Sequence, residues 1–243
     1  MSSSKSTDKI SKSITSLRSD LGSLITICAH HYQNSAITNH ADLIGDSYQL
    51  ARECQNIKSR YIVFCGVKFM ADTARIICPE QQTILLPELS AGCPLAQTID
   101  LKTALTVSRE INKILEKPVI PIVYINSEAE MKSFAGYNEG CVCTSSNALQ
   151  IIRYYLDQNR AILFIPDFNL GYNTAIKAGF SVNDICSVSR KNDQIQLSSH
   201  NRAQIYLWQG SCYVHKRFSA SQISSLRKQY PGIKIISHPE TDH

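Results

Sequence analysis

The sequence lacks several patterns that mark common classes of protein. Its nine cysteines contain no C-x-x-C pair, which disfavours a zinc ribbon or a thioredoxin-like redox site. The odd cysteine count, in a chain of 243 residues without a secretory apolar segment, disfavours a disulfide framework. No apolar run approaches the ~20 residues that a membrane-spanning helix needs, so no membrane segment is expected.

Charge of one sign is not concentrated anywhere in the sequence. The net charge of +5 comes from 25 Lys and Arg against 20 Asp and Glu, and the basic residues are scattered without interleaved aromatics. We therefore expect no nucleic-acid partner. Residues 1–20 are rich in serine and lysine and are predicted to form a flexible tail. Because Asp8 and the short lead before the first strand disfavour a transit peptide, the expected location is the cytoplasm, with a plastid as the alternative.

Strand and helix patterns alternate along the rest of the chain. Apolar strands are predicted at 24–30, 61–67, 83–89, 119–125, 141–144, 161–167, 203–210 and 233–237. Helical periodicity occupies most of the intervening segments, and residues 181–202 form an irregular polar stretch. Strands that are nearly all apolar and separated by helices predict an α/β fold with parallel sheets.

The order of these features repeats. Strands ending near His30, Tyr124 and His238 are each followed by polar side chains. The first two are then followed by a polar turn, a strand with a proline–acid pair and a cysteine in a glycine-containing turn. This order predicts a pseudo-threefold repeat of parallel-sheet α/β domains. The boundaries are a tail at 1–20, a first repeat at 21–117, a second at 118–217 and, at 218–243, the start of a third repeat that is largely missing.

Two cysteines have surroundings that suit chemistry. Cys93 precedes Pro94, which predicts a helix whose N-terminus favours a thiolate at Cys93. Cys212 also follows a glycine and has His215 three residues on, which is the spacing of half a metal site. The alternative for both is a cysteine that only packs in a turn.

Polar residues at the strand ends predict a shared ligand site, because ligands bind at the carboxyl edge of parallel sheets. Ser47 and Ser145 lie near predicted helix N-termini, where phosphate or carboxylate groups bind. Their alternative role is to cap the helices. Converging groups of this kind suit a small polyanionic substrate.

The sequence resembles the quinolinate synthases, iron–sulfur enzymes of de novo NAD biosynthesis, from about Leu24 to Glu240. The resemblance rests on the blocks AHHYQ, ADLIGDSYQLAR, FCGVKFMADTARI, LLPELSAGCPLA, YINSEAEMK, CTSSNA, IPDFNLG, WQGSCYVHKRF and HPE. It implies three pseudo-equivalent α/β domains around a cavity, each supplying one cysteine to a [4Fe–4S] cluster with one iron open to substrate.

The resemblance also implies a reaction. A transferase would condense iminoaspartate with dihydroxyacetone phosphate to quinolinate, and the open iron would act as a Lewis acid on a substrate oxygen. The implied partners are these two substrates and an L-aspartate oxidase or dehydrogenase that produces iminoaspartate.

Residue roles follow by matching motifs. The resemblance implies Cys93 and Cys212 as cluster ligands, and Tyr124, Glu240 and His238 as catalytic residues that exchange protons. Tyr32 and His215 lie in matching blocks and are expected in the cavity. The residues implied to bind substrate are His30, Ser47, Tyr124, Asn126, Ser145, His238 and Glu240.

The family pattern continues beyond HPE with a further cysteine, whereas this sequence has none after Cys212. The third cluster ligand is therefore expected to be absent from this chain, and a homodimer or a complementing C-terminal fragment is the expected partner. The alternative function is a truncated, non-catalytic remnant or a split-enzyme subunit that binds a phosphorylated or dicarboxylate metabolite.

Overall fold

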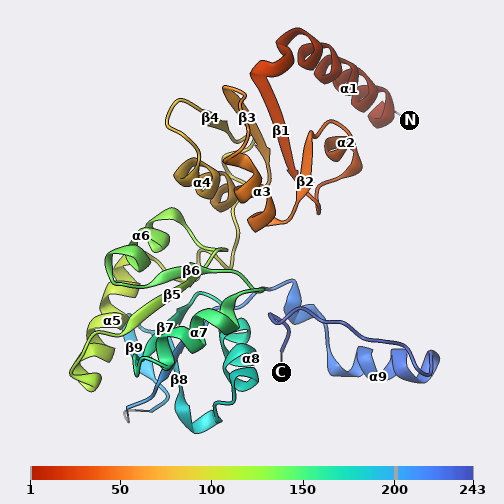
Figure 1. The fold of residues 1–243 in the computed structure, drawn as a ribbon. Coiled ribbons are helices and arrows are strands. Elements are labelled where there is room, and N and C mark those ends of the chain that lie inside the picture. The colour runs from red at the N-terminus through yellow and green to blue at the C-terminus, as the bar shows by residue number, and fades with distance from the viewer. Residues whose placement is uncertain (1, 200–201, 243) are drawn as a thin grey trace. The chain divides into compact units, whose positions relative to one another are not determined.

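The structure is a computed structural model that describes residues 2–199 and 202–242. The chain divides after Cys93 into two compact units, each built around its own β-sheet (Figure 1). Both units alternate strands and helices along the sequence, which confirms the predicted α/β fold class.

The first unit contains a four-stranded parallel sheet in the order β2-β1-β3-β4. Its helices α3 and α4 pack against each other, and Leu50 and Ala74 are fully buried at their inner faces. Asp46 begins α3 by accepting hydrogen bonds from the N–H groups of Tyr48 and Gln49. The elements are α1 (Ser2–Leu21), β1 (Ile25–His30), α2 (Ser35–Thr38), β2 (Leu43–Gly45), α3 (Ser47–Cys54), β3 (Tyr61–Cys65), α4 (Lys68–Ile77) and β4 (Thr83–Leu85).

Helix α1 occupies the segment for which the sequence predicts a flexible tail. It is tied to the connection between β1 and β2, because the Ser11 hydroxyl lies 2.9 Å from His40 Nε2 and Arg18 pairs with Asp42. The Arg18–Asp42 pair is exposed and adds little stability, whereas the Ser11–His40 contact is partly buried.

The second unit contains a six-stranded sheet in the order β6-β5-β7-β10-β8-β9. All strand pairs are parallel except the edge pair β8–β9. The elements are α5 (Leu101–Leu115), β5 (Ile120–Tyr124), α6 (Ala129–Tyr137), β6 (Cys141–Cys143), α7 (Ala148–Leu156), β7 (Ile162–Ile165), α8 (Phe168–Ala178), β8 (Ile185–Lys191), β9 (Gln194–Leu197), β10 (Ile205–Trp208) and α9 (Ala220–Gln229).

Both faces of the β5-β7-β10 region are covered, which explains why these strands are apolar throughout. On one face, Val123 and Leu163 pack with residues of α5 and α6 in the main core. On the other, α8 approaches so closely that a Cβ at Gly171 would lie 2.9 Å from Phe164 and 2.8 Å from Leu207. Helices therefore cover both faces of this region of the sheet, and its carboxyl edge is not one of the covered faces.

Helix α5 lies in the second unit, although the sequence assigns it to the first repeat. Val107 and Ile111 of α5 are fully buried in the core that includes Val123 and Phe134. The structural units therefore divide at 93/94. The repeat boundaries at 117 and 217 stay predictions.

The polar stretch at 181–202 contains an unpredicted β-hairpin, β8–β9, joined at Asn192 and Asp193. Both turn residues have positive φ angles, 50° and 60°, as in a type I′ turn. Burial alternates along β8, which is the pattern of a strand with one face covered. An Asn-Asp turn between alternating segments was the available signal.

The strand predicted at 233–237 is wrong, because the structure gives these residues no regular secondary structure. Within the described residues no strand pairs with this segment, and Ile236 is 96% exposed. A strand is defined by its hydrogen-bonded neighbour, which an apolar β-branched sequence cannot supply by itself.

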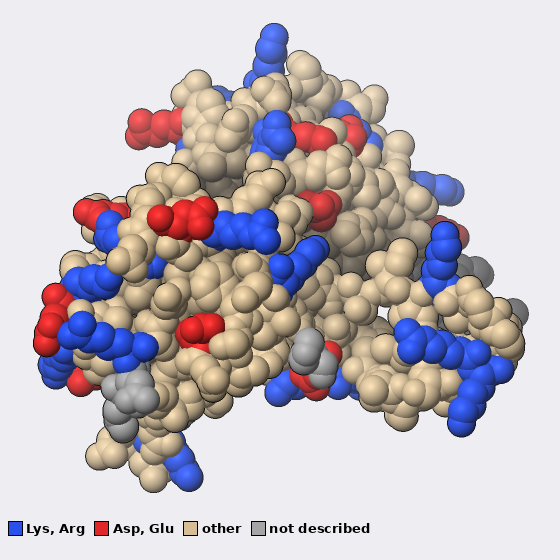
Figure 2. All heavy atoms as spheres, turned by 60° about the horizontal axis from the view of Figure 1, so that its bottom comes forward, with Lys and Arg blue, Asp and Glu red and all other residues tan. Residues whose placement is uncertain are grey.

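Charged groups of both signs are interspersed over the face shown in Figure 2. Helix α9 carries Arg227 and Lys228 in its last turn and contains no acidic residue.

Among the described residues, none of the helices has the length and apolar composition that a membrane span requires.

Candidate active site at the sheet edge of the second unit

Three neighbouring parallel strands bring polar side chains to one edge of the second sheet. Tyr124 is the last residue of β5, Asp167 follows β7, and Cys212 lies in the turn after β10. Because β5, β7 and β10 are adjacent and parallel, their carboxyl ends meet at the same edge. Within this unit, one sheet edge thus collects the polar residues of three strand ends, while the shared site predicted for His30, Tyr124 and His238 stays a prediction.

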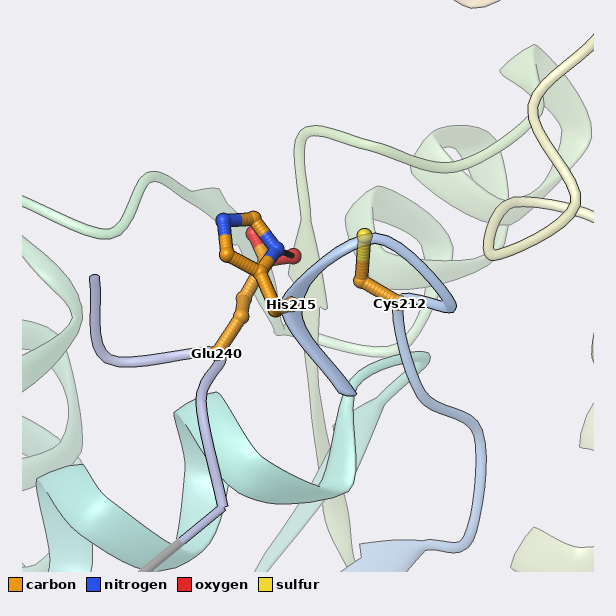
Figure 3. Close-up of side chains that lie close together, drawn as sticks. All are labelled: Cys212, His215 and Glu240. Carbon is orange, nitrogen blue, oxygen red and sulfur yellow. Dashed lines mark ion pairs between the residues drawn. The ribbon is translucent and has the colours of Figure 1, made fainter. Parts of the chain in front are cut away.

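Glu240, far away in the sequence, joins this edge, and Figure 3 shows its side chain beside those of His215 and Cys212. Its side chain is only 2% exposed. The Tyr124 hydroxyl donates a 2.7 Å hydrogen bond to Oε1, and His215 Nδ1 lies 2.9 Å from Oε2. His238 Nδ1 is 3.7 Å from Oε1, and its ring stacks on that of His215 at a centroid distance of 4.7 Å. A buried carboxylate is thus surrounded by groups that donate or exchange protons.

Burial and the neighbouring charges determine whether Tyr124 and His238 hold their protons. Burial, together with the charge of Glu240, raises the pKa of Tyr124 well above its usual value, so the phenol stays protonated and acts as a donor. Burial lowers the pKa of His238, with Glu240 opposing the shift and His215 adding to it. His238 is therefore held toward its neutral form, in which one ring nitrogen accepts a proton.

Cys212 is held by the backbone around it and by Asp167. Its N–H donates to Asp167 Oδ2 at 3.2 Å, and its sulfur receives N–H groups from His215 and Val214. Burial raises the pKa of the Cys212 thiol and Glu240 adds to the shift, while the two N–H groups oppose it in part. Ligand atoms of Cys212, His215 and Glu240 all lie within 4.8 Å of one another.

Asp167 is a site residue that the sequence interpretation did not select. It is fully buried, begins α8 by accepting the N–H of Leu170 at 2.7 Å, and accepts the N–H of Cys212 with its other oxygen. Burial raises the pKa of this carboxyl to about 7. The proline–acid pair was visible in the sequence, but the link to Cys212 depends on β7 and β10 being neighbours.

Two asparagines of α8 position the segment that carries Glu240, and these were also missed. Asn169 Nδ2 donates to the carbonyl of Glu240 at 3.1 Å, and Asn173 Nδ2 donates to the carbonyls of Pro239 and Thr241. Asparagine disfavours helix interiors, so two of them one turn apart on α8 were a usable signal for an external contact.

Asn126 and Ser145 lie at the same sheet edge and are half-buried, in the turns after β5 and β6. Ser145 precedes α7, as predicted. Asn147 is the N-cap residue of α7 and makes no side-chain capping bond; its Oδ1 accepts the N–H of Thr144, before the helix, at 2.6 Å. Ser145 lies two residues before the N-cap position, so it is not the cap residue, and its substrate role stays a prediction.

The remaining predicted residues belong to the first unit. His30 ends β1, with its ring 4.0 Å from that of Tyr32, and Ser47 is the first residue of α3. Asp46 already uses the N–H groups at the start of α3, so an anion there would compete with its carboxylate. The roles of His30 and Ser47 in substrate binding stay predictions.

Cys93 is not at a helix N-terminus, so that expectation is wrong. Residues 94–97 form a turn, in which the N–H of Thr98 reaches the carbonyl of Leu95, and the next helix begins at Leu101. Pro94 fits such a turn as well as a helix start. Cys93 is half-buried in the first unit.

His30 is expected to make the chain less stable in acid. Burial, then the neighbouring His31, lowers its pKa from 6.5 to about 4, with Asp46 opposing. Between these pH values the unfolded chain binds a proton that the folded chain does not, so stability is lost as pH falls from 6.5 toward 4, by at most about 3 kcal/mol. Urea unfolding across this range should show a shallower loss for His30→Gln than for the unchanged chain.

The matched control is His31→Gln at the adjacent, exposed residue, which should keep most of the acid dependence. An acid dependence that His30→Gln leaves unchanged would show that other groups carry it.

The fold and the site together define the class: a parallel α/β protein with a Cys, His and carboxylate group at its sheet edge. The family model described as quinolinate synthetase A protein matches residues 12–243. The chain belongs to the quinolinate synthase family.

Curated relatives agree with this assignment. The chain is 38% identical over 232 residues to a quinolinate synthase of Bacillus subtilis, covering 95% of this chain and 63% of the relative. It is 37% identical over 237 residues to a quinolinate synthase of Bacillus cytotoxicus, covering 97% of this chain and 64% of the relative. The chain therefore spans less than two thirds of the length of these relatives.

Proposed function

We propose that this chain takes part in NAD biosynthesis as a quinolinate synthase, a transferase that condenses iminoaspartate with dihydroxyacetone phosphate. The observation that carries the proposal is the buried Glu240 carboxylate, hydrogen-bonded to Tyr124 and placed beside Cys212. Family membership supplies the reaction class, and this group supplies the proton-transfer residues that two dehydrations require.

A [4Fe–4S] cluster is the cofactor that we propose, with Cys93 and Cys212 among its ligands. Two backbone N–H groups directed at the Cys212 sulfur suit a bound thiolate, while burial and Glu240 keep the pKa of the free thiol above its usual value. When bound, the cluster would supply a Lewis acid for the substrate oxygen that leaves. Cys93 is half-buried in a turn and is proposed on the family match.

The chain's own residues would bind the substrate and move its protons. Tyr124 holds its proton on the phenol oxygen and can donate it to a departing oxygen, while the carboxylate of Glu240 can accept a proton from the substrate. His238, held toward its neutral form, accepts the N–H of Glu240 at Nδ1, so its own proton is on Nε2 and can be passed on from there. Asn126 and Ser145 offer an amide and a hydroxyl to the substrate carboxylates, and His30 and Ser47 would do so from the first unit.

Anaerobic reconstitution with iron and sulfide tests the proposal. We expect about four irons per chain and quinolinate formation from the two substrates. Cys93→Ser and Cys212→Ser should lose the cluster and the activity. Cys141→Ser, at a half-buried cysteine of β6, is the matched control and should keep both.

Full iron content in Cys93→Ser or Cys212→Ser would contradict the ligand assignment. A chain that takes up no iron, makes no quinolinate and still binds a dicarboxylate or phosphorylated metabolite would contradict the catalytic proposal and favour a binding protein.

A further inference from the structure

We propose that Cys212, His215 and Glu240 form a mononuclear site for a divalent cation of the Zn²⁺ class, contained within the second unit. The inference goes beyond the proposed function, because a [4Fe–4S] cluster would draw on Cys93 of the first unit whereas this site does not. The two sites share only the sulfur of Cys212.

The three donor atoms are already close to a coordination geometry. Cys212 Sγ, a ring nitrogen of His215 and a carboxylate oxygen of Glu240 lie within 4.8 Å of one another. Bonds of about 2.0–2.3 Å in a tetrahedral zinc site place neighbouring ligand atoms roughly 3.3–3.8 Å apart. His215 Nδ1 and Glu240 Oε2, at 2.9 Å, would open slightly and the sulfur would move inward. Side-chain rotation suffices for shifts of this size.

The nitrogen and the oxygen that face each other are available for a cation. His215 Nδ1 is buried and, among the described residues, makes no hydrogen bond of good geometry despite its short distance to the carboxylate. Glu240 Oε1 accepts from the Tyr124 hydroxyl, which leaves Oε2 as the oxygen directed at His215. A cation between Nδ1, Oε2 and the sulfur would satisfy the buried nitrogen.

The groups around the ligands hold them in place, as outer-shell partners do in metal sites. Tyr124 fixes the Glu240 carboxylate, and Asp167 fixes the Cys212 backbone. Val214 and His215 direct their N–H groups at the Cys212 sulfur. Asn169 anchors the backbone of Glu240. Cys212 and Glu240 are therefore held by several partners, and the His215 ring is held by stacking on His238 at a centroid distance of 4.7 Å.

The donor set selects the class of metal. A thiolate, an imidazole and a carboxylate are the ligands of Zn²⁺ and similar borderline cations, whereas Ca²⁺ and Mg²⁺ prefer oxygen. Three protein ligands leave the fourth position for water. Binding releases the thiol proton of Cys212 to solvent and involves no change of oxidation state.

The single thiolate of Cys212 cannot serve both the mononuclear site and the cluster at once. Zn²⁺ bound here is therefore expected to block reconstitution with iron and sulfide.

Cobalt binding tests the site directly, because Co²⁺ bound by a thiolate in tetrahedral geometry absorbs visible light. The metal-free chain, titrated anaerobically, should bind one Co²⁺ that Zn²⁺ displaces. Cys212→Ser should abolish the thiolate-to-cobalt absorption, and His215→Ala or Glu240→Gln should weaken binding at least ~100-fold. Tyr124→Phe should weaken it about tenfold. Cys93→Ser is the matched control and should bind Co²⁺ normally.

Two results would overturn the inference. Loss of cobalt binding in Cys93→Ser would place the metal on the proposed cluster ligands instead. Normal binding in both His215→Ala and Glu240→Gln would show adventitious binding to a thiol. Circular dichroism of each variant separates lost binding from lost folding, and Tyr124→Phe provides a graded readout if His215→Ala fails to fold.

The same experiments separate this inference from the proposed function. Normal iron uptake and quinolinate formation without cobalt binding would overturn the mononuclear site alone. Cobalt binding in a chain that takes up no iron would overturn the cluster alone.

Discussion

Glu240→Gln is expected to lower quinolinate formation by at least ~100-fold and to leave the iron content of the reconstituted chain unchanged. The amide has nearly the size of the carboxylate and can still accept from Tyr124, so the packing of this 2%-exposed side chain is kept. What the amide loses is the negative charge and the capacity to accept a proton at neutral pH. The measurement is the steady-state rate with iron counted in the same sample.

The matched control is Glu130→Gln, at an exposed position of α6 in the same unit, which should not change the rate. An unchanged rate in Glu240→Gln would remove Glu240 from the proton-transfer steps. Loss of iron in that variant would show instead that the carboxylate supports the cluster.

Gly210→Ala is expected to destabilise the second unit by roughly 2–4 kcal/mol. A Cβ at this position would lie well inside 3.0 Å of the carbonyl oxygen of Pro166 and of Thr98 Oγ1. The Pro166 carbonyl is a backbone group, so a rotamer change cannot relieve the clash. The backbone of Gly210 is also held in place, because its own carbonyl accepts the N–H of Phe168 at 2.8 Å. The shift would pass to Cys212, two residues on. Urea unfolding should show a lower midpoint, and iron uptake should fall with it.

Gly136→Ala provides the comparison. A Cβ there meets no atom within 4 Å, and the residue lies in α6, so alanine should be neutral or stabilise by up to about 1 kcal/mol. Equal midpoints for the two variants would contradict the close approach of backbone at Gly210.

The strands β5, β7 and β10 were predictable because their apolar side chains are buried on two faces. Burial alternates along β3, whose β-branched and aromatic residues were the signal. β3, β5, β7 and β10 each lie within the predicted segments. Caps that act within three residues were also predictable: Asp46 begins α3, and Ser219 with Gln222 forms the capping box of α9. Interactions this local need no knowledge of the rest of the fold.

Other elements depend on partners that the local sequence does not name. The segment at 233–237 has the composition of a strand and forms none, whereas the polar 185–197 segment forms a hairpin at the sheet edge. Cys93 precedes a proline, yet the chain continues into a turn instead of a helix. In each case pairing or packing outweighs a weak local preference.

The sequence by itself determined the α/β class, the strand ends that carry Tyr124 and Cys212, and the family blocks that include Glu240. Only the tertiary structure decided that Tyr124 binds Glu240 across 116 positions of sequence, and that Asp167 holds Cys212. The physical reason is that strand composition follows burial of each segment, which is local. A hydrogen bond between distant side chains follows strand order and the path of the returning chain, which are set by the whole unit.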